Sequence, residues 1–249
     1  EYAEIKSIHN IRTSLFQGAG FGVIVPMIDL LKNTVEEKDN LYVVDKDILE
    51  FIFKNNEHLR KQAEGLHEIA KILDETFDLE EKDASSLCDA LPQAAAALNP
   101  FLERKETRIT YPDLQYNCTL MINIDKVLLA VEELLINAYK YCTAKSAINI
   151  FTRISEGYFW ISVKNDVTEK ERIPEQCEKL VIEPFYRILP PDESVAGIER
   201  FGMGLGLSVV DNVARKHQGS FFIKSYKDLT AKDDKDCVIA DILIPILQK

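Results

Sequence analysis

Apolar residues recur at alternating three- and four-residue steps over the first 75 residues, a spacing typical of packed helices. The first apolar seam comprises Ile5, Ile8, Leu15, Ala19, Gly22, Pro26 and Leu30. After the polar segment 32–40, a second seam comprises Ile48, Ile52, Leu59, Ala63, Leu66, Ala70 and Leu73. Two such helices predict a helical hairpin with too little interior to be stable alone. We therefore expect a homodimer in which two hairpins form a four-helix bundle.

Beyond the acidic segment 78–85 the pattern changes to short β-rich runs that alternate with helical patterns. Helices are expected at 85 to about 105, at 125–142 and at about 204–217. Strands are expected at 107–112, 117–123, 148–154, 158–165, 220–226 and 237–246, and residues 184–200 are expected to be irregular. The sequence thus predicts an all-α dimerising hairpin at 1–77, followed at 78–249 by an α+β two-layer sandwich with helices on one face of the sheet.

Composition narrows the range of partners. The chain of 249 residues carries a formal net charge of −11 and shows no basic patch, which argues against nucleic acid or an anionic membrane surface as the main partner. Its five cysteines are scattered, with no CxxC pair, so we expect reduced thiols and a cytoplasmic location. No apolar run reaches the roughly 18 residues of a membrane span. Because the chain begins at Glu1 within a helical pattern, we expect a piece of a longer protein, attached to a membrane only through segments outside this chain.

The first chemical motif is VEELLINAYKYC at 131–142. On a helix, Glu133, Asn137 and Lys140 share one face beside an apolar face. An asparagine oxygen there suits a magnesium ion whose other ligands are phosphates and water. The alternative is an ordinary helix with a solvated polar face.

The second motif is RFGMGLGLSVV at 200–210, with three glycines at every second position before a helix. Glycines let the backbone approach phosphate oxygens, and N–H groups at a helix start attract anions; the alternative is a flexible hinge. The motif follows no βαβ unit and lacks the Gly-Lys-Ser/Thr ending of a P-loop, which argues against Rossmann and Walker sites. Between the motifs, Phe185 and Tyr186 are candidates to anchor a loop, and Arg187 and Arg200 to reach phosphates.

In this order and at these separations, ELLINAYKY, EPFYR and GMGLGL resemble the ATP-binding domain of two-component sensor histidine kinases, whose fold is shared by gyrase, heat-shock chaperone and mismatch-repair ATPases. IHNIRTSL at 8–15 resembles the histidine box of the same kinases. The resemblance covers His9 to Gly206, with a two-helix spacer between the first motif and the rest.

The resemblance implies that His9 accepts a phosphoryl group from ATP and passes it to an aspartate of a response-regulator receiver domain. It implies Asn137 as the Mg²⁺ ligand and Lys140 as a phosphate contact. The other candidate nucleotide-binding residues are Tyr141, Asn165, Arg187, Arg200, Gly202, Gly204 and Gly206, the three glycines forming the hinge of a lid. Thr13 lies one turn beyond His9, where its hydroxyl would orient a water for attack on a phospho-aspartate.

Three positions depart from the family pattern. Asn10 stands where the family has an acid that accepts the imidazole proton, so a general base is missing. In the adenine-binding box, Asn165 replaces the aspartate and Val167 the first glycine, which predicts weaker adenine binding. Glu133 stands where these kinases often have asparagine. A glutamate four residues before the metal-binding Asn137 resembles the gyrase-type ATPases, in which that acid activates water.

Three hypotheses follow from these departures. The first is an active histidine kinase in which autophosphorylation is slowed by Asn10. The second is a degenerate kinase that acts as a phosphatase or a docking scaffold. The third is a gyrase-type ATPase that uses Glu133.

Overall fold

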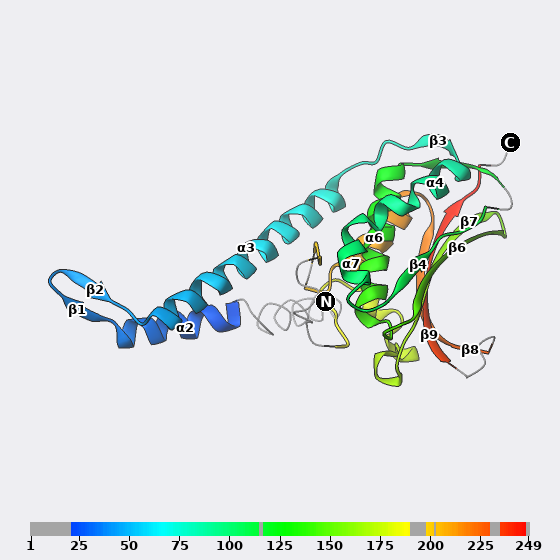
Figure 1. The fold of residues 1–249 in the computed structure, drawn as a ribbon. Helices are drawn as coiled ribbons and strands as arrows, with labels where there is room; N and C mark the ends of the chain where they lie inside the picture. The colour runs from blue at the N-terminus through cyan, green and yellow to red at the C-terminus, as the bar shows by residue number, and fades with distance from the viewer. Residues whose placement is uncertain (1–20, 115–116, 190–197, 202, 230–234, 248–249) are drawn as a thin grey trace.

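The N-terminal helices project from an α+β body (Figure 1). The computed structural model describes residues 21–114, 117–189, 198–201, 203–229 and 235–247. Helix α2 spans Phe21–Thr34 and contacts α3, which spans Lys46–Asp74. The helix predicted from the second apolar seam is confirmed, whereas the first seam lies within the described residues only from Phe21 onward.

The connection between α2 and α3 differs from the polar break that we expected. Helix α2 continues to Thr34, and the connection then forms an antiparallel hairpin of β1 (Glu36–Lys38) and β2 (Leu41–Val43). Asp39 and Asn40 form its turn with positive φ angles of 50° and 64°. Two left-handed residues match the twist of a two-residue hairpin, and Asp and Asn tolerate that conformation well.

Helix α3 has two apolar faces. Its start is capped by Asp45, whose side chain accepts from the N–H groups of Asp47 and Ile48. In its second half, Gly65, Ile69 and Ile72 are buried, and the helix contacts α7 (Gly206–Lys216) of the body. The neighbouring seam residues Ala63, Ala70 and Leu73 are exposed in the single chain. These three seam residues therefore lie away from the face that meets the body, whereas the seam residue Leu66 packs against the core of the body.

The body consists of a mixed sheet with helices on one face, as predicted (Figure 1). Its strand order is β4-β6-β7-β9-β8; β4 runs parallel to β6 and the other pairs are antiparallel. The strands are β4 (Arg108–Thr110), β6 (Ala147–Ser155), β7 (Tyr158–Asp166), β8 (Ser220–Asp228) and β9 (Lys235–Pro245). The main helices on that face are α4 (Ala84–Ala94), α6 (Ile124–Tyr141) and α7 (Gly206–Lys216).

Two expectations for the body were wrong in detail. The acidic segment contributes a strand, β3 (Glu80–Asp83), which pairs antiparallel with β5 (Thr119–Ile122) in a separate two-stranded sheet. The helix expected up to about residue 105 is interrupted at Ala95, after Pro92, and continues as a 3₁₀ turn (Ala96–Leu98) and α5 (Asn99–Leu102). Proline lacks the N–H that a continuous helix needs, which accounts for short segments here.

Helix α6 carries the first chemical motif and packs directly over the sheet. Asn123 caps its start by accepting from the N–H of Lys126. Its sheet-facing side chains belong to one core with β6, β7 and β9, and include Val127, Val131, Leu134, Leu135 and Ala138. Glu133 and Lys140 are thereby brought to the side of the helix next to α7 and the glycine motif.

Two features bear on the composition analysis. The five cysteines are free thiols, two of them buried. Among the described residues, no helix combines the length and the apolar character that crossing a bilayer requires.

The fold predicts unequal costs for two glycine substitutions. A Cβ on Gly219 would overlap the carbonyl oxygen of Leu243 in β9, whereas a Cβ on Gly157 would meet nothing within 4 Å, although its φ is +80°. We expect Gly219→Ala to lower the free energy of unfolding by about 3 kcal/mol or more, through overpacking. Gly157→Ala should cost about 1 kcal/mol, from backbone strain alone. Denaturant unfolding of both variants measures the difference, and equal losses would contradict the packing described here.

Candidate functional site

A cavity lies between α6, the sheet and the segments around residues 186–189 and 204–207; we call it the α6 cavity. Apolar side chains form much of its wall, and four of them come from the sheet: Val163, Ile223, Val238 and Ala240. Polar groups enter from α6, from the end of β7 and from the two loop segments. An apolar wall with a few convergent polar groups is typical of a small-molecule site.

The cavity brings together most of the candidate residues that the structure describes. The lining includes Glu133, Asn137, Lys140, Tyr141, Asn165, Arg187, Gly204 and Gly206. Arg200 does not line it. His9, Asn10, Thr13 and Gly202 lie outside the described residues.

The polar face of α6 presents three different groups. The side-chain nitrogen of Asn137 donates to the backbone oxygen of Glu133 at 3.0 Å, which leaves the amide oxygen as the atom that suits a cation. The ammonium of Lys140, whose side chain is 5% exposed, pairs with Glu199 at 2.6 Å. Sequence reasoning missed Glu199, because its partner lies 59 residues away. Lys140 also lies 5.3 Å from the ring centre of Tyr141.

Glu133 is a buried carboxyl in the wall of this cavity. Only 4% of the residue is exposed, and its Oε1 has no hydrogen-bond partner. Desolvation, followed by the nearby carboxylates of Glu132 and Glu199, raises its pKa from 4.5 to about 8, against the lowering effect of Arg200. The carboxyl is therefore mostly protonated at neutral pH in the absence of a ligand.

The glycine motif packs against the EPFYR segment. Gly204 has a φ of +77°, and a Cβ there would lie 2.7 Å from the backbone oxygen of Tyr186. The N–H of Phe185 donates to the backbone oxygen of Gly204 at 3.1 Å. A Cβ on Gly206 would overlap Oε2 of Glu133, so α7 begins directly against the buried carboxyl. Glycine is needed at both positions for close approach.

The end of β7 supplies the adenine-box residues. Asn165 is 3% exposed, lines the cavity and has a side-chain nitrogen without a partner. Val167 is 5% exposed, belongs to the hydrophobic core and is absent from the lining. The side chain that replaces the expected glycine therefore does not narrow the cavity.

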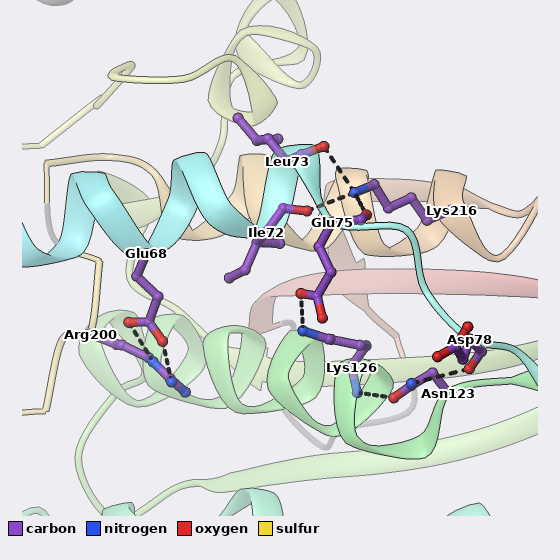
Figure 2. Close-up of polar contacts among 9 residues, drawn as sticks. All are labelled: Glu68, Ile72, Leu73, Glu75, Asp78, Asn123, Lys126, Arg200 and Lys216. Carbon is purple, nitrogen blue, oxygen red and sulfur yellow. Dashed lines mark hydrogen bonds and ion pairs between the residues drawn. The ribbon is translucent and has the colours of Figure 1, made fainter.

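The two candidate arginines point to different places. Arg187 lines the cavity, and one of its terminal guanidinium nitrogens is buried without a partner. Arg200 instead pairs with Glu68 of α3 through two hydrogen bonds (Figure 2). It also lies 3.9 Å from Glu132. The guanidinium expected at phosphate is thus held by a helix that sequence analysis had not connected to the site.

Some of the buried polar atoms without a hydrogen bond belong to residues that line the α6 cavity. Within the described residues, three buried side-chain atoms that lack a hydrogen bond line it, from Glu133, Asn165 and Arg187. Buried polar groups are normally satisfied, and leaving one unpaired costs about 1–3 kcal/mol. Two donors and one carboxyl oxygen on a shared cavity indicate a polar ligand that supplies the missing partners.

Comparison with known proteins finds sequence similarity of the body to an ATPase family. Residues 122–240 match the sequence model of the family described as histidine kinase-, DNA gyrase B- and HSP90-like ATPase. This part of the chain is thus similar in sequence to that ATPase family. No curated protein sequence matches the chain.

Solved histidine kinases have the same arrangement of helices and sheet. The histidine kinase ThkA, solved in complex with the response regulator protein TrrA, is 14% identical with a TM-score of 0.60, over 97% of this chain and 61% of that one. Full-length ShkA in complex with AMPPNP is 14% identical with a TM-score of 0.57, over 91% and 43%. The Acinetobacter baumannii histidine kinase AdeS is 13% identical with a TM-score of 0.51, over 94% and 96%. At these identities the likeness is one of fold, and it is consistent with a sensor histidine kinase core.

The raised pKa of Glu133 predicts a pH-dependent effect of Glu133→Gln on stability. Between pH 4.5 and about 8 the unfolded chain releases a proton that the folded chain retains, so stability falls as pH rises through this window. Glutamine stays neutral, so without nucleotide or divalent metal the variant should gain more in melting temperature at about pH 8.5 than at about pH 5. The exposed Glu103→Gln serves as control. The same gain at both pH values would contradict the buried, protonated carboxyl.

Proposed function

We propose that the chain is the catalytic core of a sensor histidine kinase, with a dimerising hairpin at 1–77 and an ATP-binding domain at 78–249. The γ-phosphoryl group of ATP is transferred to an imidazole nitrogen of His9: a P–N bond forms, the P–O bond to ADP breaks, and a base takes the ring proton. The group then passes to an aspartate of a response-regulator receiver domain. The ATPase family of residues 122–240 and the folds of ThkA, which binds TrrA, and ShkA, which binds AMPPNP, support this proposal.

The presence of buried, unpartnered polar atoms on residues that line the α6 cavity is the observation that carries the proposal. Asn165 offers an amide, which can both donate to and accept from an adenine edge, whereas the usual aspartate only accepts. Arg187 offers a buried cationic donor to phosphate oxygens. These groups belong to two separate motifs that line one cavity, as a nucleotide with a base and a phosphate tail requires.

The residues of α6 and the glycine motif complete the assignment. When bound, Mg²⁺ neutralises phosphate charge and orients the γ-phosphoryl group, and Asn137 offers it one oxygen ligand. Lys140 contacts phosphate and Tyr141 borders the same end of the cavity. Gly204 and Gly206 permit the close approach of backbone that phosphate binding needs. Together these groups hold the nucleotide and screen it from water.

Exposed apolar side chains on α2 and α3 support a homodimer. Large apolar side chains of both helices face solvent in the single chain, among them Val25, Ile28, Leu30, Phe51, Phe53 and Leu73. Apolar stripes along a helical pair are stabilised when a second hairpin covers them, as in four-helix bundles. The hairpin of a second copy of the chain therefore covers these apolar side chains and forms a four-helix bundle with the first.

A gyrase-type ATPase is the second candidate, and Glu133 is the observation that favours it. Its carboxyl lies at the wall of the cavity, buried and with one free oxygen, where it is placed to activate a water. Its raised pKa keeps it protonated at neutral pH without a ligand, which opposes a role as general base. We therefore rank hydrolysis below phosphoryl transfer to His9.

Incubation of the purified chain with Mg²⁺ and ATP labelled in its γ-phosphate tests the proposal. Acid-labile label should appear slowly on the protein and be absent from His9→Gln. Because Asn10 cannot accept a proton, Asn10→Asp should speed labelling by about tenfold or more, toward the 10²–10⁴-fold range of a positioned general base. Thr13→Ala should leave labelling unchanged.

Two outcomes of this assay would contradict the kinase assignment. Label that persists in His9→Gln would show that another residue accepts the phosphoryl group. Free phosphate without labelled protein, lost in Glu133→Gln, would support the ATPase instead. Labelling that is rapid in the original chain and unchanged by Asn10→Asp would show that a different base serves His9.

A further inference from the structure

Residues 199–201 touch the α6 cavity and helix α3 at the same time. On the cavity side, the carboxylate of Glu199 accepts a hydrogen bond from Lys140 at 2.6 Å, and both side chains are largely removed from solvent. Glu199 therefore pairs with the ammonium of Lys140, the same group that the proposed function assigns to a nucleotide phosphate.

The next residue reaches in the opposite direction. Arg200 donates from Nε to Glu68 at 3.1 Å and makes a second hydrogen bond from a terminal nitrogen, which gives a two-bond pair with the carboxylate (Figure 2). Glu68 belongs to α3, whereas the more distant Glu132 belongs to α6 of the body itself. The pair with Glu68 thus joins the body to the projecting helix.

A glycine in the middle of α3 makes room for this contact. A Cβ on Gly65 would lie 3.3 Å from the backbone oxygens of both Arg200 and Phe201. Glycine inside a helix costs about 1 kcal/mol relative to alanine, so its presence needs a local reason. Close approach of the 200–201 backbone to α3 supplies that reason, and the buried Phe201 anchors the same backbone in the body.

The end of α3 is attached to the body by a separate set of contacts. The ammonium of Lys216 donates to the backbone oxygens of Ile72, Leu73 and Glu75, and Lys126 pairs with the side chain of Glu75 (Figure 2). None of these groups lines the α6 cavity. The contact at Gly65 and Glu68 can therefore be lost while the end of α3 stays attached as a pivot.

A bound triphosphate conflicts with the arrangement at Lys140. Phosphate oxygens and the Glu199 carboxylate would compete for one ammonium, and like charges in a partly dry cavity repel strongly. Glu199 and Arg200 are adjacent, so a displacement of the first shifts the backbone that rests on Gly65.

We propose that Glu199 and Arg200 form a relay by which nucleotide binding in the α6 cavity releases the body from α3. With the cavity free of nucleotide, Glu199 pairs with Lys140 and Arg200 with Glu68, and the body stays docked along α3. Nucleotide phosphate displaces Glu199, the Arg200–Glu68 pair separates, and the body pivots about the end of α3. The relay rests on the proposed function, since it requires that the cavity bind ATP.

Coupling of this kind is reciprocal: if ATP weakens docking, weaker docking must strengthen ATP binding by the same factor. Titration calorimetry of the full chain with ATP and Mg²⁺ measures this directly. Glu68→Gln should raise ATP affinity about fivefold, at the low end of usual coupling because the pair is partly exposed. Glu64→Gln, an exposed carboxyl on the same helix, should leave the affinity unchanged.

A second variant tests the cavity end of the relay. Glu199→Gln should also raise ATP affinity, because it removes the competing charge from Lys140. The double variant with Glu68→Gln should gain less than the product of the two single gains, because both changes act on one equilibrium. Hydrogen exchange around residue 65 should rise on ATP addition in the original chain, reporting the loss of the contact with α3.

The outcomes separate failure of the relay from failure of the proposed function. Higher ATP affinity in Glu199→Gln, with Glu68→Gln equal to Glu64→Gln, would overturn the relay and leave ATP binding intact. Fully multiplicative gains would also overturn it, because the two ends would then be independent. Absence of ATP binding in the original chain and in all variants would overturn the proposed function and the relay with it.

Discussion

The burial of one face of helix α6 against the sheet is the constraint on which the site depends. Val127, Val131, Leu134 and Leu135 are almost fully buried, and each contributes about 2 kcal/mol through removal of apolar surface from water. With a period of 3.6 residues, this packing fixes the directions in which the other side chains of the helix point. Glu133, Asn137 and Lys140 are thereby held in the wall of the cavity.

The same packing explains why the site tolerates groups that oppose stability. Glu133 is buried with a free oxygen, and Asn165 and Arg187 each hold a donor without a partner. Such groups lower the stability of the chain without a ligand, and the core of α6, β6, β7 and β9 is large enough to hold them in place. A ligand that satisfies them gains both hydrogen bonds and relief of their desolvation cost.

Much of the body and of the cavity could be predicted from sequence, because the signals are local. The period of α6, the strands β6, β7, β8 and β9, and the spacing of Gly204 and Gly206 all lie within short windows. The β1–β2 hairpin and β3 were missed, because β1 and β3 consist of charged residues and strand pairing supplies the order.

The partners of Lys140 and Arg200 could not be read from the sequence either. Glu199 is 59 residues from Lys140, and Glu68 is 132 residues from Arg200, so only the fold brings them together. The burial of Val167 likewise depends on the path of the chain after β7, where its N–H donates to Asp236. These three contacts join segments that are distant in the sequence, which is why the sequence alone did not predict them.

The central claim is that α6 presents a nucleotide site built around Asn137, and calorimetric titration of Asn137→Ala with ATP and Mg²⁺ tests it most directly. Asn149→Ala is the matched control, because this asparagine of β6 pairs with Thr110 and is absent from the cavity lining. The account predicts a loss of ATP affinity of about 10–100-fold for Asn137→Ala, the size usual for residues that support a metal site, and no change for Asn149→Ala. Equal affinity of Asn137→Ala and the original chain would contradict it.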